Sequence, residues 1–469
     1  MTLPLDSSLQ PGVSLVVTVD RLDRDGAGVA EVRAGAGLFR LHVAGALPGE
    51  SARAKVMHVS THAFAQGRDA WADLEEIVRV SPERVAPPCP AQHRCGGCPL
   101  ANWAYAAQLE WKRGLVAKAI AAQEELARVP VTACAPSPRP FGYRANAKYV
   151  FGHDRDGKLV LGAYAPRSHE ILDMSGCPIG EPALAEVAAA LLTLLAQHAV
   201  APFDEIRRTG LLRYVVLRAN ADGKVLVALV TGREIWPKGE ALARELAAAC
   251  PAVLGVVHNI NGTAGNALFG EQEHLLFGSA SIEDTIGPAR VRLGPRSFSQ
   301  ANRLVAGRAY HDIVTAAARL GTINRVVDAY AGAGGIALAL APLAHEVVAI
   351  EENPAACATA QAFLAECGPG DPGARVRFVA GDVAEHLARV GSADLVVLNP
   401  PRRGCAMATI AAVAQLHPRL VAYLSCNPAS LARDLAALAR LGLPTVGITP
   451  YDMLAQTPHV EALALVAKD

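Results

Sequence analysis

A cysteine stands where a short apolar run of the sequence stops. The run YLS ends in Ser425-Cys426-Asn427-Pro428. Asn427 and Pro428 suit the N-cap and the first position of a helix. A cysteine beside a helix N-terminus meets a positive end, which lowers the pKa of a thiol from about 8.5. Cys426 is therefore a candidate nucleophile, and the alternative is a small buried hydrophobe at the end of a strand.

A glutamate begins the last apolar run of the chain. Glu461 opens EALALVAK and follows Gln456-Thr457-Pro458-His459. Strand ends of a doubly wound sheet gather around one crevice, so Glu461 and Cys426 are expected to lie near each other.

The elements that must position these residues alternate from about residue 296 onward. The runs RVVDAY, EVVAIE, RVRFVAGD, ADLVVLN and RLVAYLS have strand length, and helical stretches such as NPAACATAQAFLAECG separate them. Runs that are apolar on both faces and alternate with helices predict a parallel, doubly wound α/β sheet. Two final strands, TVGITPY and EALALVAK, close it.

A glycine-rich turn follows the first of these strands. In DAYAGAGG, residues 328–335, the glycines let the backbone turn tightly and approach a ligand. Glu351 ends the next strand, where an acid can accept both hydroxyls of a ribose, and Asp382 ends the third, where it could meet an adenine edge. The longer Gly-x-Gly-x-x-Gly pattern is missing, which favours S-adenosylmethionine over a nicotinamide cofactor.

The fourth strand ends in Asn399-Pro400-Pro401-Arg402. Enzymes that methylate exocyclic amines usually continue a related Asn-Pro-Pro loop with an aromatic residue that stacks on the base. Arg402 takes that position here. The loop therefore makes amine methylation less favoured. A methyltransferase acting on an exocyclic amine remains an alternative, and such an enzyme would need neither Cys426 nor Glu461.

Four of the ten cysteines form a candidate metal site. Cys89, Cys95 and Cys98 lie within one short segment, and Cys177 follows far downstream. Four thiolates in a reducing compartment suit a [4Fe-4S] cluster or a structural Zn²⁺. The uneven spacing and the distant fourth ligand fit paired zinc knuckles poorly. A non-catalytic, metal-containing RNA-binding protein is the alternative from another class.

Length and composition place the chain among multidomain globular proteins. It has 469 residues, of which 51% are hydrophobic and 19% charged. Its start lacks the pattern of a signal peptide and no apolar run could span a bilayer, so we expect a cytoplasmic protein without membrane contact. Lys+Arg and Asp+Glu both total 44, which counts weakly against RNA binding because a local basic patch suffices. The candidate patches are Arg139, Arg144 and Lys148; Arg207, Arg208, Arg213 and Arg218; and Arg402 with Arg403.

Three domains are expected. Short alternating strands with glycine turns predict an OB-like β-barrel over residues 10–79. Residues 80–295 mix strands and helices as a central α+β domain. Residues 296–469 form the doubly wound domain.

With these motifs, nearly the whole chain resembles the RNA uracil-5-methyltransferases that use S-adenosylmethionine. LPGE (residues 47–50) resembles a signature of the TRAM domain. SPERVAPPCP and CGGCPL resemble the iron-sulfur motif of the family, which favours a [4Fe-4S] cluster on Cys89, Cys95, Cys98 and Cys177. FGYRANAKYV is similar to a Tyr-Arg-Asn-Lys stretch but carries extra residues.

The resemblance also implies roles for single residues. It makes Cys426 the nucleophile and Glu461 the general base, in a class I methyltransferase domain. The expected cofactor residues are Gln300, Tyr330, Gly335, Glu351 and Asn399. Two of them depart from the family pattern, since many members carry Asn where Gly335 stands and Asp where Asn399 stands.

The implied substrate is a uridine in RNA held by a monomeric enzyme. NPPRRG resembles one subgroup that acts on 23S ribosomal RNA, and the TRAM-like region with the cysteines resembles another 23S rRNA subgroup. The two resemblances therefore agree on the RNA but disagree on the nucleotide that is methylated. A tRNA uridine is the alternative substrate. C5 of uracil is a poor nucleophile, but a thiolate that adds to C6 makes C5 carbanion-like. The target base must leave its stack to reach Cys426.

Overall fold

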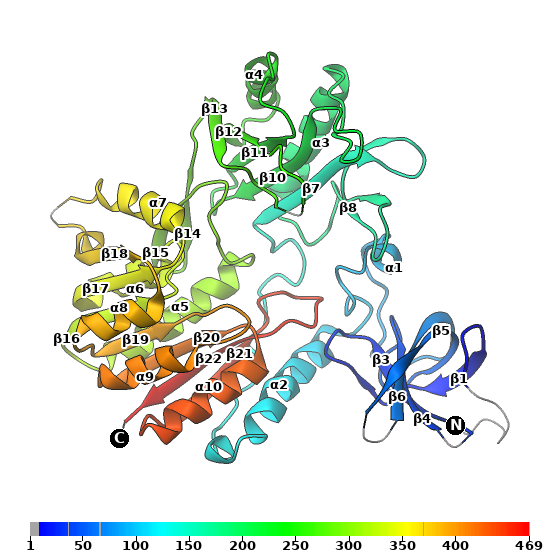
Figure 1. Cartoon of the computed structure of the whole chain (residues 1–469), viewed down its shortest axis with the longest axis horizontal. Helices are drawn as coiled ribbons and strands as arrows, with labels where there is room; N and C mark the ends of the chain where they lie inside the picture. Colours follow the sequence, from blue (N-terminus) through cyan, green and yellow to red (C-terminus); the bar gives the residue numbers. More distant parts are fainter. Residues whose placement is uncertain (1–8, 36, 65–66, 266, 369, 469) are drawn as a thin grey trace. The chain divides into compact units, whose positions relative to one another are not determined.

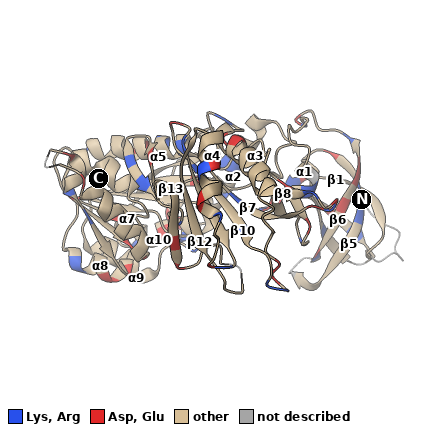
Figure 2. Cartoon of the chain, turned by 90° about the horizontal axis from the view of Figure 1, so that it is seen from above, with Lys and Arg blue, Asp and Glu red and all other residues tan. Residues whose placement is uncertain are grey.

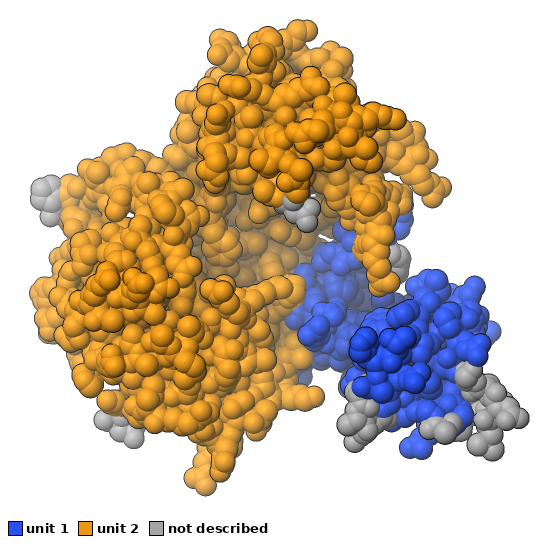
Figure 3. Space-filling view, in the orientation of Figure 1, with its two compact units in different colours: residues 1–111, 456–458 blue, residues 112–455, 459–469 orange. Residues whose placement is uncertain are grey.

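The computed structural model describes residues 9–35, 37–64, 67–265, 267–368 and 370–468. The chain divides into two compact units, shown in different colours in Figure 3: Met1–Trp111 with Gln456–Pro458, and Lys112–Ala455 with His459–Asp469. The first unit includes residues 80–111 of the predicted central domain, and the rest of that domain shares the second unit with most of the third. The three-domain division stays a prediction. Within the described ranges, none of the helices combines the length and apolar character needed to cross a bilayer.

The first unit contains a six-stranded sheet in the order β1-β5-β6-β4-β3-β2. Its strands are β1 (Ser14–Thr18), β2 (Arg21–Leu22), β3 (Gly28–Ala34), β4 (Gly37–Val43), β5 (Ser51–Phe64) and β6 (Gly67–Arg79). From Ala30 to Ala34 of β3, buried and exposed residues alternate, as expected where one face of a strand meets a core. The LPGE turn is fixed by the buried Glu50, which accepts hydrogen bonds from Leu47 N at 2.8 Å and Arg84 Nε at 2.6 Å. The short helix α1 (Gln92–Cys95) follows.

A seven-stranded sheet opens the second unit, in the order β13-β12-β11-β10-β7-β8-β9. Its strands are β7 (Asn146–His153), β8 (Leu159–Tyr164), β9 (Ile171–Asp173), β10 (Leu212–Ala219), β11 (Val225–Thr231), β12 (Val253–Ile260) and β13 (Gln272–Gly278). Helices α3 (Pro182–Gln197) and α4 (Gly239–Ala249) contact each other and pack their leucines against the sheet, so they cover one of its faces (Figure 1).

The doubly wound sheet predicted from the sequence is confirmed. Its order is β18-β17-β16-β19-β20-β22-β21, with parallel pairing from β18 to β20 and with β22 antiparallel to both neighbours. The strands are β16 (Ile323–Ala329), β17 (Ala344–Glu351), β18 (Val376–Ala380), β19 (Leu395–Leu398), β20 (Leu420–Ser425), β21 (Thr445–Tyr451) and β22 (Glu461–Ala467).

Helices cover both faces of this sheet, which explains why its strands are apolar throughout (Figure 1). Alternate residues of one strand enter opposite cores, as Val326 and Val327 of β16 do. One core contains α5 (Arg303–Ala318), α6 (Gly335–Leu340) and α7 (Pro354–Leu364). The other contains α8 (Val383–Val390), α9 (Met407–Gln415), α10 (Pro428–Arg440) and the second half of α2 (Tyr105–Ala121). The hairpin of β14 (Ile282–Ile286) and β15 (Ala289–Leu293) joins the first core.

Candidate active site

The glycine-rich turn leads directly from β16 into α6. Tyr330, Gly332 and Gly334 have positive φ angles of 65°, 57° and 82°. Glycine adopts such angles at little cost, whereas Tyr330 is a non-glycine residue in the left-handed region. The buried Asp328 accepts a hydrogen bond from Ala337 N at 2.9 Å, which ties the strand end to the helix start. The turn is therefore held in one shape by the elements on either side of it.

Glu351 ends β17 beside this turn, as the sequence predicted. Its two carboxylate oxygens accept hydrogen bonds from Gly332 N and Asn353 N, both at 2.8 Å. Each oxygen keeps a further lone pair, so the carboxylate can still accept hydroxyl groups from a ligand. Glu351 thus braces the turn and faces the cavity at the same time.

A cavity of about 540 Å³ lies outside the carboxyl ends of the strands. It falls within the size range of small-molecule sites and at the place where open α/β sheets bind ligands. Five of the six predicted cofactor residues line it: Gln300, Tyr330, Gly335, Glu351 and Asn399. This lining combines backbone amides, a carboxylate and an aromatic ring, which fits S-adenosylmethionine.

The close approach of Tyr310 explains why position 335 is a glycine. A Cβ atom there would lie 2.9 Å from Cε2 and 3.1 Å from the hydroxyl oxygen of Tyr310. An asparagine, which many members of the resembling family carry, would require the Tyr310 ring to move. Tyr310 also lines the cavity.

Asp382 is the sixth predicted cofactor residue and lies outside the cavity lining. Its exposed carboxylate caps α8 by accepting a hydrogen bond from Glu385 N at 2.9 Å. Capping of α8 is sufficient to explain an aspartate at this position. The contact of Asp382 with an adenine stays a prediction.

Cys426 stands between the end of β20 and the start of α10, as its sequence neighbours predicted. Asn427 is the N-cap and accepts a hydrogen bond from Ala429 N at 3.1 Å. Asn427 Nδ2 and Ser430 Oγ both donate to the carbonyl of Arg402, at 2.9 and 3.1 Å. The NPPRRG loop is thereby fixed against the start of α10, next to the thiol.

The predicted lowering of the Cys426 pKa by the helix end is wrong. The residue is half-buried, and burial together with the negative charge of Glu461 raises the pKa of Cys426 above its ordinary value. The positive charge of the Arg402 guanidinium lowers the pKa of the thiol and so acts in the opposite direction. Desolvation of a thiolate outweighs the half charge at a helix end, which is worth about 0.3–1 kcal/mol at the surface.

Glu461 is the first residue of β22 and only 5% exposed. Burial raises the pKa of Glu461 from its ordinary value of 4.5 to about 8. A carboxylate with this pKa is a stronger base than an exposed one and is matched to neutral pH. Glu461 therefore has the proton affinity that a general base requires.

A second cavity, of about 400 Å³, reaches the same two residues. Cys426, Glu461, Gln300 and Arg402 line both cavities. The second cavity extends from them to the sheet that contains β7 and β10. Cys426 and Glu461, the predicted nucleophile and base, thus lie where a cofactor-sized cavity meets a second cavity.

The four cysteines proposed as metal ligands do not form a recognizable metal site. Cys89, Cys95 and Cys98 are half-buried in the first unit, and Cys177 belongs to the second unit. Among the described residues, no three His, Cys, Asp or Glu side chains form a group that could hold a metal ion. The geometry does not support the predicted cluster, so no role in the chemistry is derived for it.

The predicted basic patches separate into two kinds. Arg144, Lys148, Arg218 and Arg402 line the second cavity. In contrast, Arg207 pairs with Asp204 at 3.3 Å and Arg213 pairs with Glu205 at 2.8 Å. The effect of Arg402 on Cys426 was missed, because the sequence showed this arginine as a departure from an aromatic residue and as part of a basic patch, neither of which relates it to the thiol.

Fold and site together define a class I methyltransferase. A solved structure of Pyrococcus abyssi tRNA (uracil-54, C5)-methyltransferase in complex with S-adenosyl-L-homocysteine matches 97% of this chain and 100% of its own. The TM-score is 0.73 at 23% sequence identity, a likeness that shows the fold. A family model described as RNA cap guanine-N2 methyltransferase matches residues 323–409.

Curated relatives cover the whole chain. An uncharacterized RNA methyltransferase from Geobacter sulfurreducens is 36% identical over 98% of this chain and 91% of its own length. Another, from Halalkalibacterium halodurans, is 34% identical over 96% of both chains. The chain belongs to this family of RNA methyltransferases, and it is an S-adenosylmethionine-dependent enzyme.

Proposed function

We propose that this enzyme methylates C5 of a uridine in RNA through a covalent adduct between Cys426 and C6 of the base. One observation carries the proposal: Cys426 and Glu461 line both the cofactor cavity and the second cavity. A reaction in which a thiol activates the acceptor and a carboxylate removes a proton needs both groups at that junction.

Binding of S-adenosylmethionine is assigned to the larger cavity. Glu351 would accept the ribose hydroxyls, and the glycine-rich turn would approach the ligand with its backbone. Gln300, Tyr330 and Asn399 line the remaining surface. When bound, this cofactor supplies an electrophilic methyl group.

The residues of the chain carry out the other steps. The Cys426 thiolate adds to C6 and the ring becomes an enolate, which makes C5 nucleophilic. C5 then takes the methyl group. Glu461 removes the proton from C5, the C5–C6 double bond re-forms, and Cys426 leaves C6. Arg402 stabilises the thiolate because the positive charge of its guanidinium lowers the pKa of Cys426.

A ribosomal RNA is the proposed substrate, and 23S rRNA is favoured by the resemblance of NPPRRG and of the TRAM-like region. The alternative is a tRNA, on which the Pyrococcus abyssi enzyme acts. Deletion of the gene followed by mass-spectrometric mapping of 5-methyluridine in both RNA classes separates them. A missing 5-methyluridine in 23S rRNA is expected, and its loss from tRNA alone would contradict this assignment.

Methylation of an exocyclic amine is the second candidate function. The family model for guanine-N2 methyltransferases favours it, but its match ends at residue 409, before Cys426 and Glu461. An amine already has a nucleophilic lone pair, so Cys426→Ala would leave its methylation intact. Nucleoside analysis of RNA treated with this variant therefore discriminates between the two functions.

The [4Fe-4S] cluster stays a prediction from the cysteine spacing and the resemblance. No step of the proposed reaction passes through it.

A further inference from the structure

The second cavity carries an excess of positive charge. Among its described lining residues, five are basic and one is acidic: Arg144, Lys148, Arg218, Arg296 and Arg402 against Glu461. The whole chain has a formal net charge of +0, so this excess is local. Lysine and arginine collected in a concave site concentrate field lines and attract anions.

One face of the β7–β10 pair forms the floor of this cavity. Arg218 lies opposite Asn146 in the antiparallel register, and Val216 lies opposite Lys148. All four line the cavity. The intervening residues of β10 enter the core beneath α3, because side chains alternate along a strand. The RANAK segment, residues 144–148, therefore aims its polar residues at the cavity and its alanines away from it.

Arg218 is the unusual member of this face. Its side chain is only 6% exposed, and Nη2 donates to the carbonyl of Ser297 at 2.5 Å. Its buried Nε and Nη1 have no hydrogen-bond partner among the described residues. A buried charge without partners is costly, and natural proteins rarely retain one.

Among the described residues, no acidic side chain forms a hydrogen bond or ion pair with Arg218. Asp284 is the acid whose charge acts on Arg218, and it is already held by two hydrogen bonds of 2.8 Å from Arg303. Lys148 is also affected by like charges, because burial together with the charges of Arg218 and Arg144 lowers the pKa of Lys148. The described residues therefore give Arg218 no paired anion, and an anionic ligand could take that place.

We propose that Arg218, with Lys148 and Arg144, binds a backbone phosphate of the RNA nucleotide that enters the second cavity. The proposal rests on the proposed function for the identity of the ligand. A phosphate brings a permanent charge and several acceptor oxygens, which suit the free N–H groups of a guanidinium. The site would fix the position of the sugar-phosphate backbone while the base reaches Cys426.

Arg218→Met tests the site because it removes the charge and keeps most of the side-chain volume. The probe is a short single-stranded RNA with one central uridine, and the measurement is its dissociation constant by fluorescence anisotropy over a range of salt concentrations. The variant should bind at least about tenfold more weakly. The slope of log K against log salt should fall by about 0.7, the value for one phosphate contact on a single strand.

A second RNA in which cytidine replaces the uridine separates this site from the proposed reaction. The same loss of affinity is expected, because a phosphate contact is independent of the base. A loss confined to the uridine probe would mean a base contact and overturn the proposal, as would an unchanged salt slope. If the wild-type enzyme binds both probes but methylates no uridine, the proposed function fails while the phosphate site stands.

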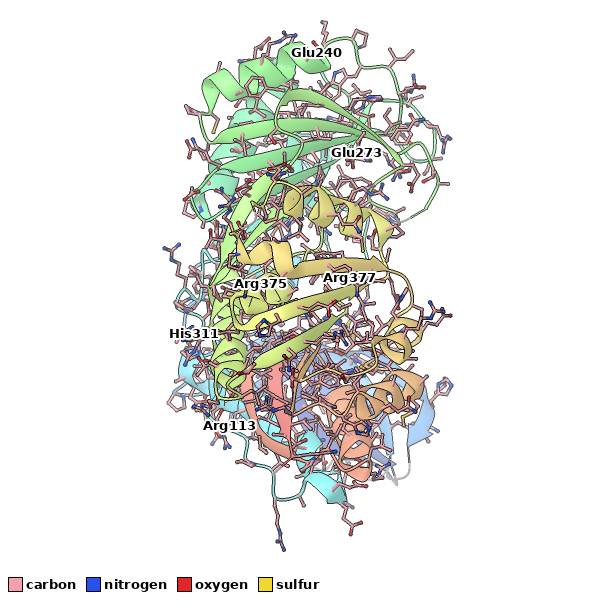
Figure 4. All side chains as sticks on the ribbon, turned by 90° about the vertical axis from the view of Figure 1, so that its left-hand side faces the viewer. Arg113, Glu240, Glu273, His311, Arg375 and Arg377 are labelled. Atoms are coloured by element: carbon pink, nitrogen blue, oxygen red, sulfur yellow. The ribbon has the colours of Figure 1, made fainter. Side chains whose placement is uncertain are left out.

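Arg377→Met is the matched control. Arg377 is an exposed arginine of β18 that lies outside both cavities at the junction, and Figure 4 labels it. It should leave RNA affinity and salt slope unchanged. Arg218→Lys restores the charge and should recover part of the slope. Arg218→Met loses the hydrogen bond to the Ser297 carbonyl but also removes a buried charge with two unpaired donors, so it should melt close to the wild type. A lower melting temperature would instead indicate a structural role and count against the proposal.

Discussion

At the scale of single residues, Cys426 and Glu461 affect each other through charge. The carboxylate raises the pKa of the thiol, and its own pKa is raised by burial. Ionising both groups together is therefore unfavourable. The positive charge of Arg402 favours the thiolate and lowers the pKa of Cys426.

Substitutions of the two residues should fail at different steps. Cys426→Ala removes the nucleophile, so neither 5-methyluridine nor a covalent RNA adduct should form. Glu461→Gln permits addition and methyl transfer but stalls proton removal, so the enzyme should stay bonded to the methylated base. Denaturing gels with labelled RNA should show a slow band for Glu461→Gln alone. Normal uridine methylation by Cys426→Ala would contradict the mechanism.

Glu461 should also make stability depend on pH. Its pKa is about 8 in the folded protein against an ordinary 4.5, so the unfolded chain loses this proton first as the pH rises. The folded state is therefore progressively penalised between these two values, and each pKa unit corresponds to about 1.4 kcal/mol. Glu461→Gln should be more stable than the wild type by several kcal/mol at pH 8.5 and nearly equal to it close to pH 4.5.

Urea unfolding at several pH values measures this difference. Glu352→Gln, which changes an exposed carboxylate, is the matched control and should show little pH-dependent gain. A pH-independent gain in Glu461→Gln would mean that the buried carboxyl does not titrate as described.

Glu351 should contribute to cofactor affinity. Glu351→Ala removes the acceptor proposed for the ribose hydroxyls and the brace on Gly332. Hydrogen bonds to a charged group are worth about 1.5–3 kcal/mol, so affinity for S-adenosylmethionine should fall at least about tenfold. Calorimetric titration measures it, with Glu346→Ala on the same strand as the control. Unchanged affinity would exclude Glu351 from the cofactor site.

At the scale of elements, the segment between β21 and β22 carries Glu461 into place. Its start is fixed by a fully buried ion pair between Lys112 of α2 and Asp452, and Lys112 also donates to the carbonyl of Leu454 at 3.1 Å. Tyr143 donates to the carbonyl of Ala455 at 3.0 Å. The segment is thus held by side chains from distant parts of the sequence.

Breaking this ion pair should be strongly destabilising. Lys112→Met leaves Asp452 buried without its cation, which typically costs about 3–5 kcal/mol. The double variant Lys112→Met/Asp452→Leu removes both charges and should recover much of that loss. Arg389→Met, which breaks the exposed pair with Glu385, should cost less than about 0.5 kcal/mol. Unfolding free energies of the four proteins test this, and equal losses for Lys112→Met and Arg389→Met would contradict it.

At the scale of the whole molecule, charge is spread without a general basic excess. Figure 2 shows Lys and Arg interspersed with Asp and Glu among the elements. Under the phosphate-binding proposal, RNA phosphates bind where basic side chains are concentrated, as they are in the second cavity. Bulk charge was therefore a poor guide to RNA binding in this chain.

The cysteine motif is also tested at this scale. Anaerobically purified protein should be brown and contain about four iron atoms per chain, the content of one cluster. Cys98→Ala should lower the iron content, whereas Cys367→Ala, outside the motif, should not. Colourless protein with one tightly bound zinc would contradict the prediction.

The sequence by itself determined the elements of the doubly wound sheet and the place of Cys426. Apolar runs of strand length alternate with helices, and Asn427-Pro428 marks a helix start, because these signals depend on near neighbours in the chain. The carboxyl ends of parallel strands must then meet. This is why five of the six predicted cofactor residues line one cavity.

Only the tertiary structure decided the electrostatics of the site. The direction of the Cys426 pKa shift depends on burial and on the charges of Glu461 and Arg402, which lie at the ends of other strands. The unpaired donors of Arg218 likewise depend on which groups the fold brings near its side chain. Desolvation and charge act through space between residues far apart in the chain, so local sequence patterns do not contain them.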